Sequence, residues 1–230
     1  LISTFTNRFF GSFTASFGNM LAKEPLEKQR KIYDVYDLLG FWIFGFVLIA
    51  FVTLSQPFIT LWLGEKLLLD DLTMVLYFVS LYLAGITLIP YHFKVAAGKF
   101  NEDKWVAFAQ AVTNLVVSIL AIQRIGLPGI FVGTIVSRMI VVMVRPYIVF
   151  KYVLQKSVIG YYVRLAARSA LALVLCLIMW KIRAFMLPQV TVLGFVLLCV
   201  LTAVIPNGVF LVLFHRSEAF HDILGRLKRT

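Results

Sequence analysis

Residues 105–125 read WVAFAQAVTNLVVSILAIQRI and residues 130–150 read IFVGTIVSRMIVVMVRPYIVF, and only the tetrapeptide GLPG separates them. Each run has about the 20 predominantly apolar residues that an α-helix needs to cross the hydrocarbon core of a bilayer. The glycines and the proline of the tetrapeptide favour a tight turn. The stretch therefore predicts two membrane-crossing helices joined by a short turn.

The rest of the chain repeats this pattern. Apolar residues make up 61% of the 230 residues and charged residues 14%, against roughly 45–50% and about 25% in ordinary soluble proteins. We expect an all-α, polytopic transmembrane helix bundle of about seven helices with no soluble domain. The expected spans are 1–22, 35–54, 72–93, 105–125, 130–150, 162–182 and 190–214. Residues 56–71 are expected to form an interfacial loop anchored by Trp62, and residues 215–230 a basic tail.

The chain begins at Leu1, and its first residues are typical of a helix interior rather than of a signal peptide. We therefore expect a fragment whose N-terminal part is missing. The two cysteines, Cys176 and Cys199, lie inside apolar runs, so we interpret them as small core hydrophobes. This pattern predicts neither a disulfide framework nor a metal site.

Basic residues exceed acidic ones by 22 − 11 = 11. They gather in alternate connections, so they report membrane orientation and no nucleic-acid partner is expected. Three connections and the tail are rich in them: Lys23, Lys28, Arg30 and Lys31; Lys94, Lys99 and Lys104; Lys151, Lys156 and Arg164; and Arg216, Arg226, Lys228 and Arg229. The other connections hold only Lys66, Arg124, and the pair Lys181 and Arg183. The alternation predicts an N-terminus outside and a C-terminus in the cytoplasm.

A polar stripe runs along the first expected span. Thr4, Arg8, Ser12, Ser16 and Asn19 recur at helical spacing and so share one face. Small polar residues can serve close helix packing. A charge within the membrane more often faces a water-filled pathway, so we favour a hydrated cavity in which Arg8 attracts an anion.

Two later spans carry further candidates. Gln110 and Asn114 share a face of the span 105–125, where interhelical hydrogen bonding is the better explanation and a cavity lining the second. Arg138 lies near the middle of the span 130–150, too deep to reach the interface easily, and is a second cavity cation. Arg145, nearer the cytoplasmic end, is expected to reach the headgroups.

Acidic residues are expected only in loops or at helix ends, with Asp37 the closest to a membrane interior. The sequence shows no spaced metal-ligand set, no phosphate-binding glycine loop and no nucleophile and base pair. We therefore expect no enzyme and no cofactor. Cations without anions inside the membrane indicate an anionic substrate or anionic lipid.

Several segments resemble the C-terminal half of Wzx-type polysaccharide repeat-unit flippases, in the multidrug/oligosaccharidyl-lipid/polysaccharide exporter superfamily. The resemblance covers residues 1–157, and the spans within 158–214 match only by hydrophobicity and position. Its most specific part runs from Phe93 to Ser137. The segments are TNRFFGSFTASFGNMLAKE (6–24), FITLWLGEKLLL (58–69), FKVAAGKFNEDKW (93–105), NLVVSILAIQRIGLPGIFVGTIVS (114–137) and RPYIVFKYV (145–153).

The resemblance implies one lobe of a MATE-like, two-lobed fold of twelve to fourteen helices in the bacterial cytoplasmic membrane, with the N-terminal lobe outside this sequence. It implies export of undecaprenyl-diphosphate-linked oligosaccharides by alternating access, with membrane lipids and the polysaccharide polymerase machinery as further partners. Cavity cations of the family hold the diphosphate or acidic sugars, and Arg8 and Arg138 are the residues onto which that role is carried.

Three alternatives stay open. A multidrug antiporter of the same superfamily would need an intramembrane acid. A lipid-linked peptidoglycan precursor flippase shares the arginine pattern. A membrane glycosyltransferase or polymerase would need large outer loops with acids or histidines, whereas the longest outer loop here is the short one around Trp62.

Overall fold

The computed structural model describes residues 14, 16–187 and 189–227. This part of the chain is 88% helical and has no strand, so the expected all-α fold is confirmed. The elements are α2 (Leu26–Leu63), η1 (Glu65–Leu67), α3 (Asp71–Ile86), α4 (Leu88–Ala96), η2 (Asn101–Asp103), α5 (Lys104–Ile125), α6 (Pro128–Ile148), η3 (Val149–Val153), α7 (Ile159–Met186), α8 (Val192–Phe214) and α9 (Glu218–Leu227).

Six helical segments of the described chain are long and apolar enough to cross a membrane. They correspond to the six expected spans after the first one, and the tight turn of residues 126–127 joins α5 to α6 as expected. Most of the expected first span lies outside the described residues, and its end, residues 16–23, is helical. The chain is therefore a multi-pass membrane protein.

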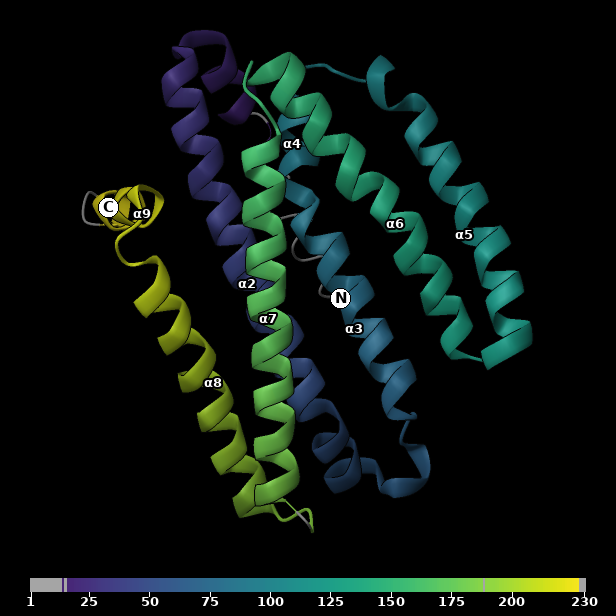
Figure 1. The fold of residues 1–230 in the computed structure, drawn as a ribbon. Helices are drawn as coiled ribbons and strands as arrows, with labels where there is room; N and C mark the ends of the chain where they lie inside the picture. The colour runs from purple at the N-terminus through teal and green to yellow at the C-terminus, as the bar shows by residue number, and fades with distance from the viewer. Residues whose placement is uncertain (1–13, 15, 188, 228–230) are drawn as a thin grey trace.

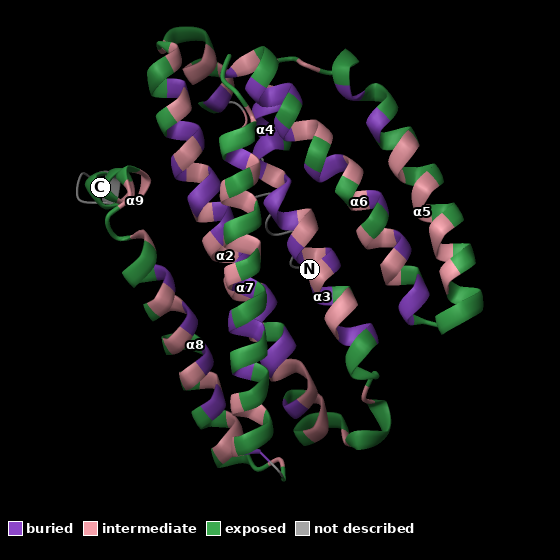
Figure 2. Ribbon diagram, viewed as in Figure 1, coloured by how far each residue is buried: buried purple, intermediate pink, exposed green. Residues whose placement is uncertain are grey.

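The longest helix, α2, forms the centre of the bundle. It packs against α3, α7 and α8, while α6 packs against α3 and α5 lies outermost against α6 (Figure 1). Figure 2 shows the consequence for burial: α2 carries many buried residues, and α5 is mostly exposed or half-buried. In a membrane, the apolar surface of α5 faces lipid or another helix.

Helix α2 is longer at both ends than the sequence indicated. It begins at Leu26, inside the expected polar connection, and runs to Leu63 through most of the expected interfacial loop. At 38 residues it is about 57 Å long, almost twice the thickness of a bilayer core. Pro57 does not end it, because a single missing donor costs less than leaving a whole turn of backbone unpaired near lipid.

The expected span 72–93 is divided into α3 and α4 at Thr87. Pro90 has no N–H to continue the hydrogen-bond ladder, and the hydroxyl of Thr87 donates to the backbone carbonyl of Ala84 at 2.8 Å. At the other end, Asp70 caps α3 by accepting hydrogen bonds from the side chain and the backbone N–H of Thr73. These bonds hold the pKa of Asp70 below its ordinary value.

Most of the expected basic tail is helical. Its residues Glu218–Leu227 form α9, which Figure 1 shows end-on, lying across the direction of the long helices. The ring of Phe220 stacks on Trp42 of α2, with ring centroids 6.0 Å apart and planes 16° apart. Charge alone predicted a tail, but the apolar residues among the charges lie on one helical face and cover α2.

Helices α5 and α6 approach closely along a seam of small residues. Gly129, Gly133 and Ser137 recur every fourth residue on α6, the spacing that lets two membrane helices pack backbone to backbone. A Cβ atom at Gly133 would lie 2.6 Å from the backbone nitrogen of Ser118 and 2.9 Å from its Cα. The hairpin therefore depends on glycine at this position.

Candidate functional site

Charged side chains of different elements meet at three places in the part of the chain that the structure describes. One is a single long contact, 3.8 Å between Arg183 of α7 and Asp71 of α3. The other two are clusters, and the first of these lies between α2 and α7. Arg164 donates to Asp34 at 2.9 Å, and Arg168 donates to Asp37 at 2.7 Å. The outer pair is 39% exposed on both sides, whereas the side chains of Arg168 and Asp37 are 14% and 10% exposed. Two cations meet two carboxylates, so this cluster is balanced in charge.

This α2–α7 cluster corrects the sequence analysis. Asp37 is buried about three turns into α2, so the expectation of no buried carboxylate is wrong. Arg164 lies inside α7 rather than in a loop, and Arg168 was not among the predicted site residues. The missed signal was two acids three residues apart and two arginines four residues apart, because each spacing puts both members on one helical face.

The second meeting of charges lies between α4, η2 and α6, and we call it the α4–α6 cluster: Lys94, Asp103, Arg138 and Arg145. Lys94 and Asp103 are 4% and 7% exposed and form an ion pair through Oδ2 of the aspartate. The Nε of Arg145 lies 3.4 Å from the same oxygen, and its guanidinium lies over the ring of Tyr91, 5.0 Å from the centroid.

The expectation that Arg145 reaches the headgroups is wrong. Its side chain is 19% exposed, because the ring of Tyr91 and the carboxylate of Asp103 hold it against the protein. Arg138 lies seven residues earlier, which is about two turns and therefore on the same face of α6. In both arginines the Nε atom is buried and makes no hydrogen bond with any described residue.

The α4–α6 cluster is unbalanced in charge. Lys94 and Arg145 share one carboxylate, that of Asp103, and among the described residues no carboxylate pairs with Arg138. Unpaired charge is costly in a low-dielectric interior. Arginine also has five N–H donors in a fixed fork that matches the oxygens of phosphate and carboxylate. The arrangement therefore suits an anion that brings several acceptor oxygens.

The other candidate residues that the structure describes are not part of this cluster. Asn114 donates to Thr134 at 3.2 Å and to Ser137 at 3.3 Å, which are the expected bonds between helices. Gln110 is half-buried on α5, and Ser16 and Asn19 are exposed. The remaining members of the polar stripe, Thr4, Arg8 and Ser12, lie outside the described residues.

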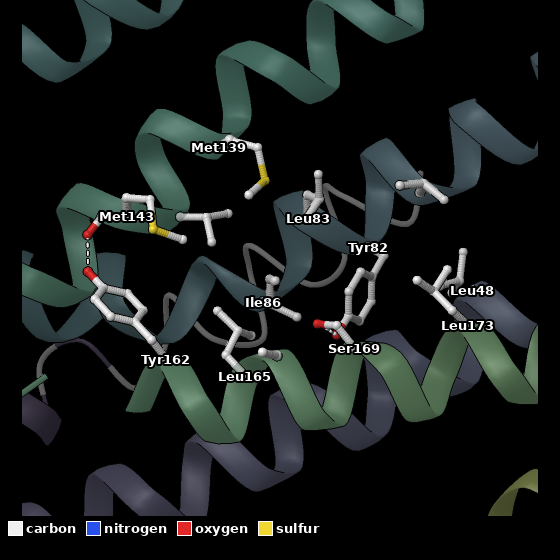
Figure 3. Close-up of a pocket in the computed structure, with 13 residues that line it drawn as sticks. Leu48, Tyr82, Leu83, Ile86, Met139, Met143, Tyr162, Leu165, Ser169 and Leu173 are labelled. Atoms are coloured by element: carbon white, nitrogen blue, oxygen red, sulfur yellow. Dashed lines mark hydrogen bonds between the residues drawn. The ribbon is translucent and has the colours of Figure 1, made fainter. Parts of the chain in front are cut away.

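An apolar groove of about 260 Å³ lies between α3, α6 and α7 (Figure 3). Its polar groups are bonded to one another: the hydroxyl of Tyr82 lies 2.8 Å from that of Ser169, and Tyr162 donates to the carbonyl of Met143. The groove therefore presents hydrocarbon. It is lined by Leu48, Val79, Tyr82, Leu83, Ile86, Met139, Val142, Met143, Tyr162, Leu165, Ala166, Ser169 and Leu173.

The two ends of the bundle differ in charge. Figure 1 places the start of α2, the end of α4, and the connection from α6 to α7 at one end, and the η1 and α5–α6 turns at the other. The first end carries the connections that are rich in lysine and arginine. Both cysteines are free, and within the described chain no three His, Cys, Asp or Glu side chains come together as a metal site.

Comparison of the chain with protein-family models, curated proteins and solved structures gives no match. The fold and the charged clusters define its class: a multi-pass α-helical membrane protein in which Arg168 is paired with a carboxylate and Arg138 meets none among the described residues.

Proposed function

We propose that this chain is the C-terminal lobe of a Wzx-type flippase. The whole protein translocates undecaprenyl-diphosphate-linked oligosaccharide repeat units across the bacterial cytoplasmic membrane for surface polysaccharide biosynthesis. The basic end of the bundle faces the cytoplasm, in line with the preference of cytoplasmic connections for lysine and arginine. The headgroup occupies a hydrated cavity between two lobes, and rocking of the lobes exposes that cavity to alternate sides.

One observation carries the proposal: the positive charge of Arg138 is within a membrane-crossing helix, and no described carboxylate balances it. Residues of this kind usually mark a substrate or ion pathway, because a charge facing lipid is expensive. Arg145 adds a second guanidinium on the same face. The two arginines are about 10 Å apart along the helix axis. Because their side chains are flexible, the two guanidinium groups suit a diphosphate with its attached sugar.

The test compares arginine variants in the full-length protein, with exported polysaccharide and the amount of inserted protein as readouts. Arg138→Ala and Arg145→Ala should each reduce export at normal protein amounts. A charge-assisted hydrogen bond is worth roughly 1.5–3 kcal/mol, which is one to two orders of magnitude in affinity. Arg138→Lys should give an intermediate value, because lysine keeps the charge but loses the planar fork.

Arg124→Ala is the matched control, because Arg124 is an exposed arginine in the last turn of α5. If the arginines only hold helices together, alanine lowers the amount of inserted protein and export per molecule stays constant. Normal export from a well-inserted Arg138→Ala, Arg145→Ala double variant would remove the anion-binding role.

The antiporter alternative gains one observation, the buried carboxylate of Asp37. A drug cation or a proton would need that carboxylate to be available. Arg168 already donates to it at 2.7 Å, so the balanced α2–α7 cluster favours a structural role. The flippase remains the better supported function.

A further inference from the structure

Asp103 is bonded in an unusual way for a buried carboxylate. Both of its cationic neighbours, Lys94 and Arg145, approach the same oxygen, Oδ2. The other oxygen, Oδ1, is buried and makes no hydrogen bond with the described residues. Buried polar atoms without a partner are uncommon in native structures, and each one calls for an explanation.

The contact between Arg145 and Asp103 is also weak in geometry. The Nε···Oδ2 distance is 3.4 Å, whereas charge-assisted N–H···O bonds are usually about 2.7–2.9 Å long. The two residues come from different elements, α6 and η2, so the contact ties the α4–α5 connection to α6. Lys94 is therefore the closer partner of Asp103, and the contact from Arg145 is the weaker of the two.

We propose that Asp103 acts as an internal competitor for the phosphate of the substrate. Without substrate, its carboxylate neutralises part of the α4–α6 cluster. When the headgroup arrives, phosphate oxygens replace Asp103 at Arg145, and Asp103 stays with Lys94. This inference rests on the proposed function, since it assigns the anion at Arg138 and Arg145 to the headgroup phosphate.

Two consequences of this exchange suit a transporter. The carboxylate lowers the net affinity for phosphate, so that the substrate can leave as well as enter. The exchange also removes one charged contact between η2 and α6, so that substrate binding favours one arrangement of these elements over another. Phosphate wins at Arg145 because its several oxygens can accept from both edges of the guanidinium fork.

The test measures binding of inorganic pyrophosphate to the full-length protein in lipid nanodiscs by isothermal titration calorimetry. Asp103→Asn should bind about tenfold more tightly than wild type, a gain of about 1.4 kcal/mol. Glu102→Gln is the matched control. It removes the same charge one residue away, where the carboxylate lies 3.6 Å from Lys99 and not near Arg145, so its affinity should stay within twofold of wild type.

Asp103→Asn leaves Lys94 buried without its counter-charge, which can prevent folding. The double variant Lys94→Met, Asp103→Asn removes both members of that pair and keeps both arginines, so it should also bind more tightly than wild type. If wild type binds pyrophosphate and both variants bind it with equal or lower affinity, the competitor role alone is overturned. Absence of pyrophosphate binding in wild type and in both variants would overturn the proposed anion site together with it.

Discussion

Gly133→Ala should open the α5–α6 hairpin. The added Cβ would lie 2.6 Å and 2.9 Å from backbone atoms of Ser118, and backbone within a helix cannot move aside as a flexible side chain does. Helix α5 must therefore move away from α6. Its main contacts are with α6, so little else holds it in place.

The loss of folding stability in Gly133→Ala has two contributions. Inserting a methyl group into a tightly packed contact costs about 1–3 kcal/mol. Separation also breaks the bonds from Asn114 to Thr134 and Ser137, and such interhelical bonds average about 0.6 kcal/mol each in membranes. The sum is about 2–4 kcal/mol, which corresponds to a fall in Tm of roughly 4–16 °C for a chain of this size.

Thermal unfolding of the purified protein in detergent measures this fall. Gly208→Ala is the control, because a Cβ added there meets nothing within 4 Å and alanine favours helix. Adding Ser118→Ala to Gly133→Ala should restore little stability, since the backbone clash remains. A Gly133→Ala protein as stable as the Gly208→Ala control would refute the close approach of the two helices.

Three further predictions concern charged positions. Asp37→Leu should destabilise the protein by about 3–5 kcal/mol because it leaves Arg168 buried without its partner, and Asp37→Leu, Arg168→Met should recover most of that loss in thermal unfolding. Asp34→Asn, in the more exposed pair, should cost at most about 1 kcal/mol, and equal losses at positions 34 and 37 would contradict this account. Single cysteines at the exposed positions Glu65 and Lys156 test the orientation in intact cells. Position 65 should react with an impermeant reagent and position 156 should not; the reverse result would invert the topology.

The positions of the six membrane-crossing helices in the described chain were predictable from hydrophobic length alone. The span expected at residues 105–125 is α5 at Lys104–Ile125, and the GLPG turn is where it was expected. Helix ends were less predictable, because polar residues that suggested a loop also fit the terminal turns of a helix longer than the bilayer core. Helix α2 therefore begins at Leu26 and not near Val35.

The pairing of charges was not predictable in the same way. Hydropathy shows where a charged residue lies along its own helix. Its ion-pair partner usually comes from another helix that is far away in sequence, so the pair cannot be found from hydropathy. Arg168 and Asp37 are 131 residues apart, and only the packing of α7 on α2 joins them. Arg145 looked like a residue of the membrane surface for the same reason, because its partner Asp103 comes from a different element.

An arginine inside the membrane is therefore weak evidence for an anion site until its neighbours are known. Arg168 and Arg138 both lie within membrane-crossing helices, yet Arg168 meets a carboxylate at 2.7 Å and needs no ligand to balance its charge. Arg138 has no such carboxylate among the described residues, and Arg145 on the same face only shares one with Lys94. If anion binding is the function of this lobe, loss of Arg138 should impair export while loss of Arg168 should impair folding, and that contrast separates the two roles.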